Sequence, residues 1–131
     1  MFSVAILAFA LIFQSPFKPY ASASQHIRRG DGVVVVSTMN RCPPCLALKR
    51  RVAGMAPAIA RTGAVCMALN KDDPADARAA RHYNMLVRAT RWPQIFAIRW
   101  TGNNWHVGRQ LSGNATERQI LQLIQAAKVA R

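Results

Sequence analysis

The chain has 131 residues, of which 51% are hydrophobic and 18% are charged. This length suits one domain and excludes two, and the hydrophobic content excludes a chain that is disordered throughout. Lys and Arg number 18 against 5 Asp and Glu, and a formal net charge of +13 attracts acidic proteins, anionic lipids or nucleic acid. The cysteines number 3, and an odd count argues against a fully paired structural framework.

The chain begins with an apolar segment over residues 1–13, and the small residues Ala-Ser-Ala-Ser follow at 21–24. This pattern is typical of a secretory signal peptide with an A-x-A cleavage site. We therefore predict a signal peptide over residues 1–23, cleaved after Ala23, and one exported domain over residues 24–131. No Lys or Arg precedes the apolar segment, so a short uncleaved anchor is the alternative. The expected location is the bacterial periplasm, with the domain either free or anchored in the inner membrane.

The first half of the domain predicts a strand, a helix and a second strand. Residues 24–32 are polar and form a lead-in, and the four valines at 33–36 predict a strand buried on both faces. The helix after them has an apolar face with spacings of four, three and four, and Pro57 predicts a kink or break in it. That apolar face consists of Leu48, Val52, Met55 and Ile59. Residues 64–69 form the second strand, so a parallel, right-handed βαβ unit is expected.

The second half predicts a helix, a hairpin and a final helix. A short helix is expected over residues 74–83, followed by a loop. Residues 95–100 and 105–110 are strands joined by a turn, which predicts an antiparallel hairpin. The last helix is expected to start at Asn114, with Glu117 completing a capping box. The expected fold class is α/β, with a four-stranded mixed sheet flanked by helices.

The chemistry of the chain is concentrated in Cys42-Pro43-Pro44-Cys45. Cys42 directly follows a buried strand and starts a helix, where the partial positive charge of the helix N-terminus stabilises a thiolate. Arg41 adds positive potential, whereas Pro43 and Pro44 lack N–H groups that could donate to the sulfur. Cys42 is therefore the expected nucleophile, and Cys45, one turn deeper, is expected to resolve the mixed disulfide.

The chain resembles the thioredoxin family in the layout of this region. A strand leads into a Cys-x-x-Cys motif and a helix, and a proline stands at the start of a later strand. The resemblance covers roughly residues 32–130 and implies a thioredoxin-like fold and thiol–disulfide oxidoreductase activity. It also implies that Pro93 is a cis-proline packed against the reactive pair, and that the backbone of Trp92 pairs with the substrate chain. Arg41, Trp92 and Pro93 are the substrate-binding residues expected on this basis.

The sequence departs from the thioredoxin pattern at several positions. Arg41 stands where a Trp is common, Pro43-Pro44 replaces Gly-Pro, Val36 replaces a buried Asp and Arg50 replaces the kinking proline. The first strand and helix of full-length thioredoxin are expected to be missing. The direction of electron transfer, as oxidase, reductase or isomerase, stays open.

The expected cofactor set is empty, since a dithiol carries the two electrons itself. The expected partners are proteins with thiols or disulfides and a membrane redox protein that regenerates the pair; nucleic acid is not expected, and the N-terminal segment or the basic surface could contact membrane. Without a second Cys-x-x-Cys motif a zinc site is not expected, and Cys66 is expected to be a buried core thiol. The alternatives are a binding or assembly module of an envelope, secretion or conjugation apparatus without redox turnover, and a copper or zinc carrier.

Overall fold

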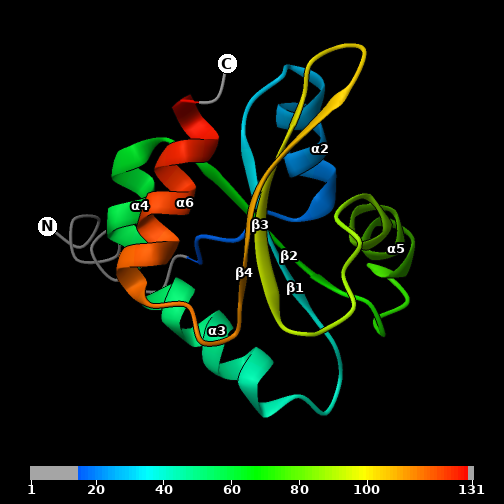
Figure 1. Cartoon of the computed structure of the whole chain (residues 1–131), viewed down its shortest axis with the longest axis vertical. Helices are drawn as coiled ribbons and strands as arrows, with labels where there is room; N and C mark the ends of the chain where they lie inside the picture. The colour runs from blue at the N-terminus through cyan, green and yellow to red at the C-terminus, as the bar shows by residue number, and fades with distance from the viewer. Residues whose placement is uncertain (1–14, 130–131) are drawn as a thin grey trace, which may run out of the picture.

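A computed structural model describes residues 15–129 of the chain (Figure 1). Its elements in chain order are α2 (Tyr20–Arg28), β1 (Val33–Thr38), α3 (Pro43–Gly54), α4 (Ala56–Thr62), β2 (Val65–Asn70), α5 (Ala77–Leu86), β3 (Gln94–Trp100), β4 (Trp105–Ser112) and α6 (Glu117–Val129). The four strands form one sheet in the order β2-β1-β3-β4. The predicted α/β fold with a four-stranded mixed sheet is confirmed.

The central strand β1 defines the register of the sheet. It pairs in parallel with β2, where Val33 lies opposite Val65, and antiparallel with β3, where Val33 lies opposite Ile98. β3 pairs antiparallel with β4 as the predicted hairpin. All six residues of β1 are buried, because helices cover both faces of the strand.

The alternation of side chains along β1 divides the core into two layers. Val34 and Val36 pack with α3, α4 and α6 on one face, and Val33 and Val35 pack with α2 and α5 on the other. Figure 1 shows α4 and α6 on one side of the sheet and α2 and α5 on the opposite side. Burial of each valine contributes about 1.5–3 kcal/mol, so this short strand is a major source of stability.

The N-terminal part of the fold differs from the expectation. Residues 24–32 were expected to be a lead-in, but α2 begins at Tyr20, and Ala23 and Ile27, one turn apart, are buried against the sheet. Phe17 bridges to Cys66 of β2. The expectation that the first helix is missing is therefore wrong, whereas among residues 15–129 only this isolated bridge precedes α2 and no strand does.

The position of α2 also bears on the expected end of the signal peptide. The expected cleavage point after Ala23 lies inside α2, and the side chain of Ala23 is 0% exposed. The apolar segment at 1–13 lies outside the described residues. Among residues 15–129, no helix is both long and apolar enough to cross a membrane.

The predicted break in the long helix is confirmed. α3 ends and α4 begins around Met55, and Pro57 occupies the first turn of α4. Proline cannot donate the backbone hydrogen bond that a continuous helix would need at that point. Gly63, with a φ of 75°, ends α4 in the left-handed conformation that glycine adopts readily.

The expected starts of α5 and α6 are both too early. At α6 the capping box is formed by Thr116 and Gln119, whose side chains accept each other's backbone N–H at 3.1 and 2.9 Å, rather than by Asn114 and Glu117. At α5 the carboxylate of Asp73 accepts the N–H of Ala75, which holds residues 73–76 in turns.

Candidate active site

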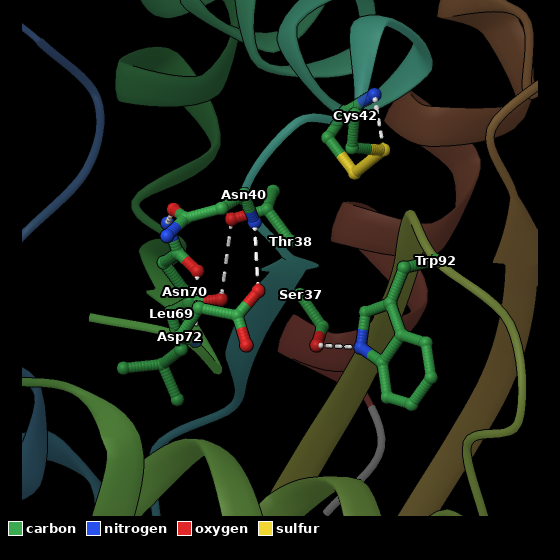
Figure 2. Close-up of a disulfide and its surroundings, with 9 residues drawn as sticks. Ser37, Thr38, Asn40, Cys42, Leu69, Asn70, Asp72 and Trp92 are labelled. Carbon is green, nitrogen blue, oxygen red and sulfur yellow. Dashed lines mark hydrogen bonds between the residues drawn. A yellow bond between two sulfur atoms is a disulfide. The ribbon is translucent and has the colours of Figure 1, made fainter. Parts of the chain in front are cut away.

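Cys42 and Cys45 form a disulfide at the point where β1 leads into α3, with the Cα atoms 5.2 Å apart. Cys42 is the N-cap of α3, and its sulfur accepts the backbone N–H of Cys45 at 3.2 Å. Pro43 and Pro44 occupy the first helical positions and have no N–H, so this is the first amide of the helix that can reach the sulfur. Figure 2 shows the disulfide and Trp92 at the same end of the sheet.

The two cysteines are both buried and differ slightly in their exposure. Cys42 is 6% exposed and Cys45 is 2% exposed, so Cys42 is the more accessible member of the pair. The surface around them is apolar, because Pro43 and Pro44 are exposed and Leu46 is 56% exposed. An incoming disulfide would therefore meet Cys42 first, across an apolar rim.

The loop before Cys42 is held by hydrogen bonds to the loop after β2. Arg41 is exposed and has a φ of 55°, an unusual conformation for a residue with a Cβ. The preceding Asn40 donates its N–H to the carboxylate of Asp72 at 2.9 Å, and its side-chain oxygen accepts from Asn70. This hydrogen bond from Asn40, and then the bond from Lys71, lowers the pKa of Asp72. These hydrogen bonds hold the backbone just before Arg41 and Cys42 in place.

Pro93 and the cysteine-bearing turn both lie near Gly113. The Trp92–Pro93 peptide bond is cis, and Pro93 is buried at the start of β3. A Cβ placed on Gly113, just after β4, would lie 2.8 Å from Cγ of Pro93 and 3.9 Å from Cβ of Pro44. Gly113 therefore lets Pro93 and Pro44 approach the same point, a role that the sequence did not reveal.

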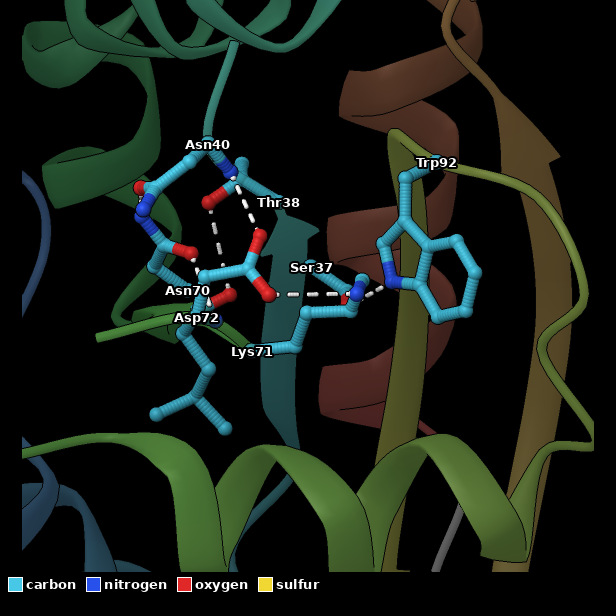
Figure 3. Close-up of polar contacts among 8 residues, drawn as sticks. Ser37, Thr38, Asn40, Asn70, Lys71, Asp72 and Trp92 are labelled. Carbon is cyan, nitrogen blue, oxygen red and sulfur yellow. Dashed lines mark hydrogen bonds and ion pairs between the residues drawn. The ribbon is translucent and has the colours of Figure 1, made fainter. Parts of the chain in front are cut away.

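Trp92 is held by a chain of polar contacts, and Figure 3 shows the first of them, from the indole to Ser37. Its indole N–H donates to the hydroxyl of Ser37 on β1 at 3.0 Å, and that hydroxyl donates to Oδ1 of Asn84 on α5 at 2.7 Å. The ammonium of Lys71 lies 5.2 Å from the centre of the indole ring. Ser37 and Asn84 are buried, and this chain satisfies polar groups that would otherwise destabilise the core. Sequence reasoning missed both residues, since their only signal is a polar residue on an otherwise apolar face.

Cys66 is separate from this site. It is a free cysteine on β2, 1% exposed, and burial raises the pKa of its thiol to about 12. The expectation of a core thiol is confirmed, and its thiolate is scarce at neutral pH. Within residues 15–129, no group of three or more His, Cys, Asp or Glu side chains is arranged to hold a metal ion.

No protein-family model matches the sequence, and a search of curated proteins finds no match. Solved structures do match. A thioredoxin from Thermus thermophilus is 16% identical with a TM-score of 0.64, covering 86% of this chain and 86% of its own. A thioredoxin from Trichomonas vaginalis is 18% identical with a TM-score of 0.61, covering 84% of this chain and 96% of its own. A structure described as DsbH oxidoreductase is 12% identical with a TM-score of 0.57, covering 88% of this chain and 85% of its own.

These matches cover between 84% and 88% of this chain. Together with the sheet order and the disulfide at the start of α3, they show that the chain has the thioredoxin fold.

Proposed function

We propose that this protein exchanges thiols and disulfides with protein substrates through Cys42 and Cys45. The observation that carries the proposal is a disulfide between Cys42 and Cys45 at the N-terminus of α3. The fold is shared with thioredoxins and with an oxidoreductase described as DsbH, which supports the same chemistry.

In the reducing direction, the thiolate of Cys42 attacks one sulfur of the substrate disulfide. A mixed disulfide forms, and the other substrate sulfur leaves as a thiolate that takes up a proton. Cys45 then loses its proton and attacks the sulfur of Cys42, which releases the second substrate thiol and forms the Cys42–Cys45 disulfide. The substrate gains two electrons and two protons, and the dithiol loses both. The same steps in reverse oxidise a substrate dithiol.

Two features of the site favour Cys42 for the intermolecular step. It is the more exposed sulfur, and the N–H of Cys45 donates to it at the positive end of α3. The burial of Cys45 keeps the resolving sulfur away from other reactants. We propose that a membrane redox protein restores the pair and that no dissociable cofactor takes part, because the dithiol carries both electrons.

The test is to trap the mixed disulfide. Reduced Cys45→Ala should accumulate a mixed disulfide with a test protein that carries a disulfide, because Cys42 attacks that disulfide and no second cysteine releases the complex, whereas reduced Cys42→Ala should not. Cys66→Ala is the matched control and should reduce insulin as fast as the wild type. Equal insulin reduction by wild type and Cys42→Ser would overturn the proposal and favour a binding module. A redox titration of the Cys42–Cys45 pair then gives the direction of transfer.

We also propose that the chain is exported to the periplasm by its apolar N-terminal segment, where an oxidising compartment makes a redox pair useful. The burial of Ala23 and the bridge from Phe17 to Cys66 support retention of residues from Phe17 onward in the folded protein. Cell fractionation and N-terminal sequencing of the isolated protein test both points. A cytoplasmic location, or a first residue after Ala23, would contradict them.

A further inference from the structure

A depression lies beside the candidate active site. It has a volume of about 840 Å³ and is bounded by α5, the loop between α5 and β3, and Lys71 after β2. Trp92 forms part of its wall, and Trp92 is also the residue next to Pro93. A chain that reaches Cys42 past Trp92 would therefore continue into this depression, which we call the α5 pocket.

The α5 pocket is lined by cations that lack internal partners. Arg78, Arg81 and Arg88 are exposed, recur at spacings of three and seven, and take part in none of the ion pairs within residues 15–129. Lys71 adds a fourth positive charge, although it pairs with Asp72 at 3.2 Å. No carboxylate lines the pocket. The electrostatic potential in the pocket is therefore positive. The opposite face of α5 packs into the core through Ala80 and Tyr83.

The pocket also has an apolar component. Met85 is 72% exposed and lies on the same face of α5 as Arg78 and Arg81, and the indole of Trp92 is part of the wall. Alternating cations and apolar groups suit a polypeptide that carries carboxylates and an apolar side chain. From residue 78 to its last residue, Leu86, α5 rises about 12 Å, which corresponds to about four residues of extended chain, and Arg88 lies in the turn that follows the helix.

We propose that the α5 pocket binds an acidic segment of about four residues, next to the reactive cysteine of the substrate protein. This inference rests on the proposed exchange function and adds the class of substrate. Arg78, Arg81 and Arg88 act as specificity determinants by holding the carboxylates. Met85 and Trp92 hold an apolar side chain of the same segment.

The experiment compares two disulfide peptides that differ in one flank, which carries four Glu in one and four Gln in the other. At about 50 mM salt, the wild-type second-order rate constant should be about tenfold higher for the Glu peptide. Salt of about 0.5 M should remove most of this preference, because screening shortens the range of the attraction.

Two variants with the same change in charge locate the effect. In the triple variant Arg78→Ala/Arg81→Ala/Arg88→Ala, the ratio of the Glu to the Gln rate should fall to about one. The control replaces three exposed arginines outside the pocket with alanine, and it should keep most of the preference. The control positions are Arg61, Arg109 and Arg118. An equal loss of preference in both triples would overturn the pocket and assign the effect to overall charge.

The remaining outcomes separate this inference from the function on which it rests. Exchange of both peptides at equal rates by the wild type overturns the docking inference alone, whereas exchange of neither overturns the proposed function. Fluorescence anisotropy with a cysteine-free Glu peptide tests the pocket without redox chemistry. A thymidine oligonucleotide serves as the probe for nucleic acid. If it binds through the same arginines and the protein shows no preference for the Glu peptide, the proposal of an acidic polypeptide is overturned in favour of nucleic acid.

Discussion

Gly113→Ala places a methyl group where the ring of Pro93 lies. The added Cβ would be 2.8 Å from Cγ and 3.1 Å from Cδ of that ring. Carbon atoms in ordinary contact lie about 3.5 Å apart or more, so the ring or the end of β4 must move by about 0.7 Å. Overpacking of this kind costs about 1–3 kcal/mol. The same methyl group would lie 3.9 Å from Cβ of Pro44 in the turn that carries the disulfide, so we also expect exchange with a peptide disulfide to slow by about tenfold.

The free energy of unfolding, measured by urea denaturation of the oxidised protein, and the exchange rate together test this prediction. Gly54→Ala is the matched control, because its added Cβ has no atom within 4 Å. Gly54 ends α3, so alanine there should stabilise the protein by about 0.5–1 kcal/mol. A Gly113→Ala variant with the stability and the exchange rate of the wild type would refute the packing of Pro93 against Gly113.

Three further predictions concern polar and titratable groups. Ser37→Ala leaves Oδ1 of Asn84 buried without its donor, so the free energy of unfolding in urea should fall by about 1–3 kcal/mol. Burial raises the pKa of Cys66 from 9.0 to about 12, so above pH 9 the unfolded state loses its proton first and stability falls as pH rises. Between pH 9 and pH 10 the wild type should lose about 1 kcal/mol more than Cys66→Ala in urea titrations. The N–H of Asn40 lowers the pKa of Asp72 below 3.8 in the folded protein. The ionised carboxylate therefore stabilises the fold above pH 3.8, and this stabilisation is lost as the pH falls through the pKa of the folded state. In Asp72→Ala, the urea midpoint should fall less steeply with decreasing pH in the acid range than it does in the wild type.

The core of the fold was predictable because it depends on local patterns. Four consecutive valines can only be buried on both faces, and the helix that follows has its apolar residues on one side. Pro57 breaks that helix wherever its partners lie, since the missing N–H is a property of the residue itself. The cysteine pair at the start of the helix is visible for the same reason.

The helix α2 was missed because its sequence supports two interpretations. Ala-Ser-Ala-Ser is typical of a signal cleavage region, but the same small residues also fit a helix that lies close to a sheet. Ala23 and Ile27 are the two residues of α2 that are buried, which is too weak a periodic pattern to recognise without the surface they pack against. Tertiary contact with β1, β2 and β3 decides in favour of the helix.

By itself, the sequence determined the order of the elements from β1 onward, the redox-type cysteine pair and the proline that precedes β3. Only the tertiary structure decided how the site is supported, because the supporting contacts join residues that are far apart in the chain. The indole of Trp92 reaches a hydroxyl 55 residues away, and the N–H of Asn40 reaches a carboxylate 32 residues away. Gly113 acquires its role only from the Pro93 ring that the antiparallel hairpin brings against it. The spacing of apolar and polar side chains can be read from residues that are neighbours in the sequence. Hydrogen-bond partners and close contacts such as that of Gly113 with Pro93 depend instead on how the strands are arranged in the folded sheet.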